Sequence, residues 1–200
     1  MSGGENQRNG ETTGSARERL LSAAVEVLLD RGYRGATSRE IARVAQANEV
    51  TLFRLFSTKD DLLAEAIVQR AATDRESVPA PTGDMQADLE NLAELTVRSL
   101  SSGGHLLVRI LPEIPRLPAE QRKVVRESLV ETQQSLVALF RHYQDLGRLV
   151  GEPAEFLCTS FMGPILMVVG AAQSREEPVQ FDASQHVRVF LEGARKGAGQ

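Results

Sequence analysis

The sequence contains little of what a catalytic or disulfide-bonded protein usually needs. Its 200 residues include one cysteine, three histidines and no tryptophan. Cys158 alone cannot form an intramolecular disulfide, and the apolar residues around it predict a buried, unreactive thiol. His105, His142 and His186 lie far apart and in no metal-ligand spacing. Since there is also no glycine-rich phosphate loop or nucleophile elbow, we expect no metal, no cofactor and no enzymatic activity.

Long hydrophobic runs are also scarce. No signal-peptide-like apolar segment lies at the start, so we expect a cytoplasmic protein. The most apolar stretch, residues 156–172, is short for a bilayer span and contains Pro164 and two glycines. We therefore interpret it as a buried helix and expect no membrane contact.

Charge of one sign does not dominate the sequence. The net charge is −4, which argues against a nonspecifically sticky basic protein. Residues 16–70 nevertheless carry nine Lys and Arg against eight Asp and Glu, while the rest of the chain is acidic. This weak asymmetry would direct residues 16–70, rather than the remainder, toward DNA.

Strand patterns are absent, and apolar residues recur at helical spacing along most of the chain, so we predict an all-α fold. The Pro- and Gly-rich segment 77–84 indicates a domain boundary. A short apolar helix is expected at 105–111. The predicted organisation is a disordered arm at 1–15, a three-helix helix-turn-helix domain at 16–76 and a larger helical domain at 84–197.

Residues 37–62 contain the signals for two short helices and the start of a third. Thr37 and Glu40 have the spacing of a capping box. Gln46 and Ala47 would form the turn, and Asn48 would cap the second helix. Two short helices joined by a tight turn are typical of a helix-turn-helix.

The exposed positions of this motif are the candidate DNA-binding residues. Arg54 is the best candidate for reading a base edge, because a guanidinium can bond O6 and N7 of guanine together. Residues 37–39 and Lys59 lie at helix starts, where phosphate contacts are common. Taken singly, each residue favours an ordinary cap or a solvated charge, but together, at this spacing, they favour DNA binding. The full candidate set is Thr37, Ser38, Arg39, Asn48, Glu49, Thr51, Phe53, Arg54 and Lys59.

These motifs together resemble the DNA-binding domain of the TetR family of bacterial regulators. The resemblance runs from about residue 17 to 67 and rests on Gly32-Tyr33, Thr37, Ile41-Ala42, Thr51-Leu52-Phe53, Phe56 and Lys59. Three positions depart from the family pattern. Gln46 replaces the usual turn glycine, Phe53 replaces a tyrosine whose hydroxyl would bond a phosphate, and Leu55 replaces a polar aromatic residue.

The second domain contains candidates for a dimer interface. The helix near 153–173 is apolar on nearly every side, so a second copy of the chain is a natural cover, although burial in its own core is the alternative. The resemblance likewise implies a homodimer formed by the last two helices. The candidate interface residues are Phe156, Phe161, Ile165, Val169, Val187, Phe190, Leu191 and Ala194.

The resemblance further implies a small-molecule pocket between the middle helices. Each candidate residue taken alone favours ordinary core. The candidates are His105, Arg109, Phe140, Tyr143, Phe161, Met162 and Met167. The expected function is a DNA-binding transcription regulator, a repressor released from a palindromic operator by an unidentified small-molecule effector. The alternative is a helical DNA-binding or interaction protein without an effector.

Overall fold

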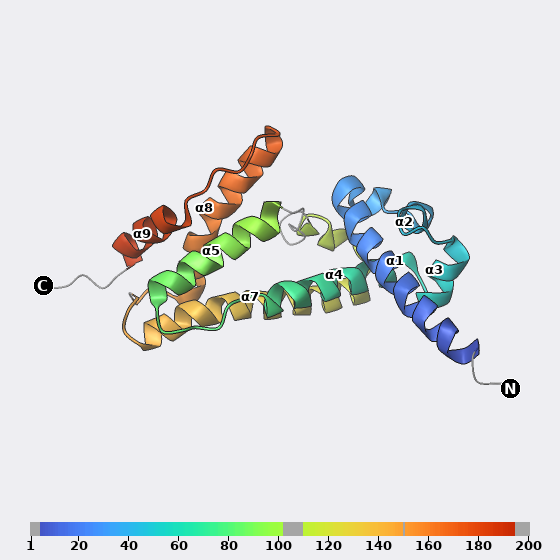
Figure 1. Cartoon of the computed structure of the whole chain (residues 1–200), viewed down its shortest axis with the longest axis horizontal. Coiled ribbons are helices and arrows are strands. Elements are labelled where there is room, and N and C mark those ends of the chain that lie inside the picture. The colour runs from blue at the N-terminus through green and yellow to red at the C-terminus, as the bar shows by residue number, and fades with distance from the viewer. Residues whose placement is uncertain (1–4, 102–109, 150, 195–200) are drawn as a thin grey trace, which may run out of the picture. The chain divides into compact units, whose positions relative to one another are not determined.

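The computed structural model describes residues 5–101, 110–149 and 151–194, with side chains from residue 16 to 193 (Figure 1). These ranges contain helices and their connections and no strand, which confirms the predicted all-α fold. The helices are α1 (Glu5–Gly35), α2 (Ser38–Val44), α3 (Glu49–Leu55), α4 (Lys59–Glu76), α5 (Met85–Ser101), the short 3₁₀ helix η1 (Ile114–Arg116), α7 (Ala119–Asp145), α8 (Ala154–Ser174) and α9 (Ala183–Ala194).

The chain forms two compact units, and their limits differ from the predicted domains. Unit 1 comprises Met1–Ala72 and Leu106–Leu129, and unit 2 comprises Thr73–His105 and Val130–Gln200. The predicted boundary at 77–84 lies between α4 and α5. The later segment joins unit 1 because Ile110, Ile114 and Val125 are buried in that unit's core. Most of the short helix predicted at 105–111 lies outside the described residues.

Helix α1 begins earlier than predicted. It starts at Glu5, so residues 5–15, expected to be disordered, are helical. Extending an existing helix adds a backbone hydrogen bond per residue without a new nucleation step, which explains how a sequence with few apolar residues continues it. The regular helix is interrupted at Gly32, because this glycine has φ 66° and lies outside the helical region of the backbone.

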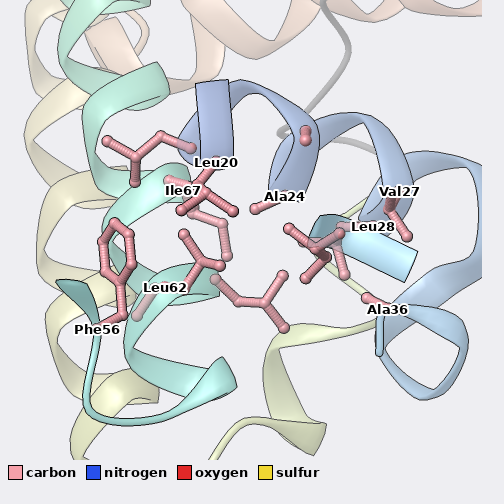
Figure 2. Close-up of a cluster of buried hydrophobic side chains, with 14 of the residues drawn as sticks. Leu20, Ala24, Val27, Leu28, Ala36, Phe56, Leu62 and Ile67 are labelled. Atoms are coloured by element: carbon pink, nitrogen blue, oxygen red, sulfur yellow. The ribbon is translucent and has the colours of Figure 1, made fainter. Parts of the chain in front are cut away.

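The core of unit 1 is a continuous aliphatic cluster that includes one aromatic ring (Figure 2). Leu20, Ala24 and Leu28 face it from α1, and Ile41 faces it from α2. Helix α4 adds residues spaced so that one face is buried: Leu62, Leu63, Ala66 and Ile67. Each of these side chains is at most a few per cent exposed, so the head, unit 1, has a well-formed core to which residues 110–125 also contribute.

Helices α5, α8 and α9 pack with the second part of α7 to form unit 2. Its core is centred on three phenylalanines, with Phe140 and Phe161 at 5.6 Å and Phe161 and Phe190 at 5.1 Å between ring centroids. Both pairs have the edge-to-face geometry that aromatic rings favour. His186 packs on Phe161 at 4.7 Å between ring centroids. The last two helices are thereby joined through side chains of one chain.

Within this chain, helix α8 is buried on one face only. Leu157, Phe161 and Ile165 face the core of unit 2, whereas Phe156 is 58% exposed and Met167 is 74% exposed. By length and composition alone, α8 meets the criterion for a membrane span, a criterion that the core helix of a soluble protein also meets.

A polar network that the sequence did not predict lies inside unit 2. Asp88 is 3% exposed and accepts hydrogen bonds from the Tyr143 hydroxyl and from the backbone and hydroxyl of Thr82, the latter two at 2.8 and 2.7 Å. Burial raises the pKa of Asp88, but the hydrogen bonds from Tyr143 and Thr82 outweigh it and hold the pKa below its ordinary value. The pKa of Tyr143 is raised to about 12 by burial and by Asp88. The network holds the connection before α5 against α7.

We predict that Tyr143→Phe destabilises the protein by about 1–3 kcal/mol, because a buried carboxylate loses a hydrogen-bond donor. Tyr33→Phe is the matched control, since the Tyr33 hydroxyl bonds Asp60 at 2.8 Å in a partly exposed place. Urea unfolding followed by circular dichroism would measure both variants. An equal or smaller loss for Tyr143→Phe than for the control would show that the buried network adds little stability.

Candidate nucleic-acid interface

Helices α2 and α3 form the predicted helix-turn-helix, and side chains cap both. The Thr37 hydroxyl accepts from the Glu40 amide at 3.2 Å, and the Asn48 side chain accepts from the Thr51 amide at 2.7 Å. Thr58 does the same for Asp61 at the start of α4, at 3.0 Å. These bonds satisfy amides that have no partner within the helix. The predicted N-caps at Thr37 and Asn48 are confirmed.

The capping box at Thr37 is only half formed. The Glu40 carboxylate does not return to the Thr37 amide, which donates to the Gly35 carbonyl instead. The Glu40 carboxylate instead forms ion pairs with Arg43 at 2.6 Å and with Arg31 at 2.9 Å. The hydrogen bond from Arg43, assisted by the charges of both arginines, lowers the pKa of Glu40. The Glu40 carboxylate pairs with the two arginines because their guanidinium groups form stronger, charge-assisted bonds than one backbone amide does.

The turn between α2 and α3 contains a residue in the left-handed region. Gln46 has φ 52°, one of two positive-φ non-glycine residues in the described part of the chain. The amides of Gln46 and Ala47 bond the carbonyls of Arg43 and Ala42 at 3.2 and 2.9 Å, which closes the end of α2. The turn thus keeps a shape that suits glycine, at a conformational cost to glutamine.

Two buried side chains determine which side of α3 faces solvent. Leu52 and Phe56 are 0% and 4% exposed and belong to the core of unit 1. On the opposite side of the helix, Val50, Phe53 and Arg54 are exposed. Since residues three and four apart share a helix face, these three side chains form one patch.

The predicted DNA-binding residues lie around this patch with different exposures. Thr37, Arg39, Asn48, Phe53 and Arg54 are exposed, and Ser38, Glu49, Thr51 and Lys59 are half-buried. Val50 is not among the predicted site residues. Its 78% exposure is set by how α3 packs, which the sequence alone does not specify.

Lys59 is held in place by its neighbours. Its ammonium lies 4.1 Å from the centre of the Tyr33 ring, 3.4 Å from the Tyr33 carbonyl oxygen and 3.7 Å from an Asp60 carboxylate oxygen. Burial and the hydrogen bond to Asp60 raise the pKa of Tyr33 to about 12. A cation fixed on a ring has a defined position, as a phosphate contact requires.

The segment that joins unit 1 from later in the sequence supports this part of the site. The Glu113 carboxylate accepts the Tyr33 amide at 2.9 Å, next to the Gly32 turn. The Gln121 side-chain amide donates to Asp61 at 2.7 Å, and this bond together with those from Thr58 lowers the pKa of Asp61. Sequence reasoning missed both contacts, because their partners lie 80 and 60 residues apart in the chain.

The predicted pocket residues do not gather around one opening. Phe140, Tyr143 and Phe161 are fully buried core residues, Met162 is half-buried and Met167 is exposed. His105 and Arg109 lie outside the described residues. A hollow of about 350 Å³ in unit 2 is lined by a different set: Ser160, Pro164, Gln180, Phe181, Asp182, Gln185, His186, Val189 and Phe190.

Most of the predicted dimer-interface residues are core residues of their own chain. This correction applies to Phe161, Ile165, Val169, Val187 and Leu191, all at most 2% exposed. Phe156 is exposed, Phe190 is half-buried, and the side chain of Ala194 is outside the description. The exposed apolar residues of α8 and α9 that periodicity did not single out are Met167, Val168 and Val189.

A helix-turn-helix with a capped, outward-facing second helix defines a DNA-binding domain. The sequence model of "Bacterial regulatory proteins, tetR family" matches residues 20–66. Residues 20–66 thus match the DNA-binding domain of this family, which confirms the resemblance seen in the sequence.

Relatives known by sequence are named as HTH-type transcriptional regulators. YvkB of Bacillus subtilis is 36% identical over 84 residues, which cover 42% of this chain and 44% of YvkB. PksA of the same organism is 30% identical over 132 residues, covering 65% of this chain and 54% of PksA. The chain therefore spans about half the length of these relatives.

Solved structures share the fold over nearly the whole chain. A TetR-family transcriptional regulator from Agrobacterium tumefaciens has a TM-score of 0.71 at 18% identity, with 92% of this chain and 100% of that chain covered. The flavonoid-responsive regulator FrrA has a TM-score of 0.65 at 16% identity, with the same coverage. At this identity the likeness concerns the fold, and it extends through both units.

We predict that Gln46→Gly stabilises the protein by about 1 kcal/mol, because glycine adopts positive φ without the Cβ penalty. Gln46→Val should destabilise it, since a β-branched side chain is poorly suited to this conformation. Thermal unfolding of the three proteins would give the order. An unchanged stability for Gln46→Gly would show that the glutamine side chain compensates for the backbone cost.

Proposed function

We propose that this protein is a homodimeric, cytoplasmic transcription regulator that binds a palindromic operator through α3. We further propose that it is a repressor and that a small-molecule effector releases it from DNA. The observation that carries the proposal is the capped α3 of a tetR-family head, whose Leu52–Phe56 side is buried while Arg54 is exposed. Within the described residues, no ion pair or hydrogen bond engages the Arg54 guanidinium, so it is available to a guanine edge.

The exposed apolar side chains of the last two helices support the dimer. Phe156, Met167 and Val168 on α8 and Val189 on α9 are exposed although each is large and apolar. Exposed apolar side chains on these helices favour a two-fold partner, which would offer the same side chains in return. Two heads in a dimer would contact half-sites about one helical turn of DNA apart, roughly 34–36 Å.

The proposal of an effector rests on the second unit and on one relative. FrrA is described as flavonoid-responsive, and its fold covers 92% of this chain. An effector would act by favouring a conformation of the dimer whose heads do not fit the operator. The alternative is a helical DNA-binding or interaction protein without an effector, which would hold its DNA at every ligand concentration.

The experiment that tests the function is selection of bound sequences from a random DNA pool by the purified protein. An enriched inverted repeat is expected. Failure to enrich any sequence would contradict the proposed operator binding. The recovered repeat then serves as the probe in a screen of apolar and aromatic small molecules, where a dose-dependent release separates the effector model from its alternative.

We predict that Arg54→Ala weakens operator binding by about 1–3 kcal/mol and relaxes sequence preference at one position of each half-site. The physical reason is loss of a bidentate contact with guanine. The measurement is a repeat of the selection together with binding curves on the wild-type operator. Arg98→Ala, which removes an exposed arginine from α5, is the control. Unchanged selectivity in the Arg54 variant would refute the assignment to base reading.

We predict that Lys59→Ala weakens binding to all DNA sequences by a similar factor and lowers the salt dependence by about one phosphate contact. Lys123→Ala, an exposed lysine of α7, is the control and should change neither quantity. Binding curves at several salt concentrations on operator and random DNA would measure both. A loss confined to the operator would instead assign Lys59 to sequence reading.

A further inference from the structure

Val50 is the most exposed large apolar side chain of the described part of the molecule. It is 78% exposed and occupies the second position of α3, directly after the Asn48 cap and Glu49. Isolated exposed apolar residues are common on protein surfaces, so exposure alone decides nothing. The position is what matters, because this helix is the one proposed to enter the major groove.

Local stability does not explain a valine at this place. A β-branched residue is a weaker helix former than alanine, and α3 has only seven residues. The Val50 side chain also makes no core contact, since Leu52 and Phe56 hold the buried side of the helix. A role on the outside of the helix accounts for it better than a role in folding.

The major groove offers one apolar group at a base edge, the C5-methyl of thymine. Val50 lies four residues before Arg54, so the two side chains share a face and their Cβ atoms are about 5–6 Å apart. Successive base pairs along the duplex are about 3.4 Å apart. Two side chains at this separation therefore meet base pairs one or two steps apart.

We infer that Val50 is a specificity-determining residue that packs on a thymine methyl group, one or two base pairs from the guanine contacted by Arg54. This inference rests on the proposed function, because it assumes that α3 reads the operator. It adds an apolar contact to the polar contacts of Arg54, and it requires a thymine at that place in each half-site.

The test uses the inverted repeat recovered by selection, in which each thymine is replaced singly by deoxyuridine. Deoxyuridine pairs as thymine does but lacks the C5-methyl, so only the apolar contact is removed. For the wild-type protein we expect one thymine per half-site whose replacement raises Kd about fourfold, the effect of losing one buried methyl. Replacement in both half-sites should raise Kd about sixteenfold.

Val50→Ala is the decisive variant, and Val124→Ala is its matched control on α7, where Val124 is also exposed. Val50→Ala should bind the thymine and deoxyuridine operators equally at that position, while the control should discriminate as the wild type does. Neither substitution removes a buried side chain, and circular dichroism melting would verify that both variants fold.

The outcomes are distinguishable. If the wild type enriches no DNA sequence, the proposed function fails and the inference with it. If an operator is found but no deoxyuridine substitution matters, operator reading stands and the Val50 inference is overturned. Equal discrimination by Val50→Ala and the wild type overturns it as well, and assigns the methyl contact to another residue such as Phe53.

Discussion

The burial of Leu52 and Phe56 decides which side of α3 faces solvent. Both side chains enter an aliphatic core built from α1, α2 and α4, and both are nearly inaccessible. A helix of seven residues has little stability by itself, so its orientation comes from this packing. Once these two residues are inside, Val50, Phe53 and Arg54 are necessarily outside. The candidate DNA-reading patch is thus a consequence of core packing.

The connections around α3 hold it in that orientation. Asn48 caps its start, and Gln46 takes up a left-handed conformation so that α2 can end and the chain can turn. Beyond α3, Tyr33, Lys59 and Asp60 form a small cluster in which ring, cation and carboxylate fix one another. Glu113 and Gln121 reach this region from a segment far along the chain. The head therefore contains a part of the sequence that a linear division assigns to the second domain.

The interior of unit 2 also depends on specific contacts between distant residues. Asp88 is a charged residue in the otherwise apolar stripe of α5, and it is tolerated because Tyr143 and Thr82 supply hydrogen bonds that offset its desolvation. Helix α8 shows the opposite case, since its apolar residues exceed what its own chain covers. Helix α5 thus buries a charged residue, and helix α8 exposes apolar side chains.

The sequence by itself determined the features that depend on residues within about four positions of one another. These are the helical periodicities, the caps at Thr37, Asn48 and Thr58, the stop at Gly32 and the turn at Gln46, because each follows from local backbone chemistry. Only the tertiary structure decided the exposure of Val50, the ion pairs of Glu40, the one-sided burial of α8 and the place of residues 106–129 in unit 1. Burial and long-range pairing depend on segments distant in the chain, and spacing within one segment contains no information about them.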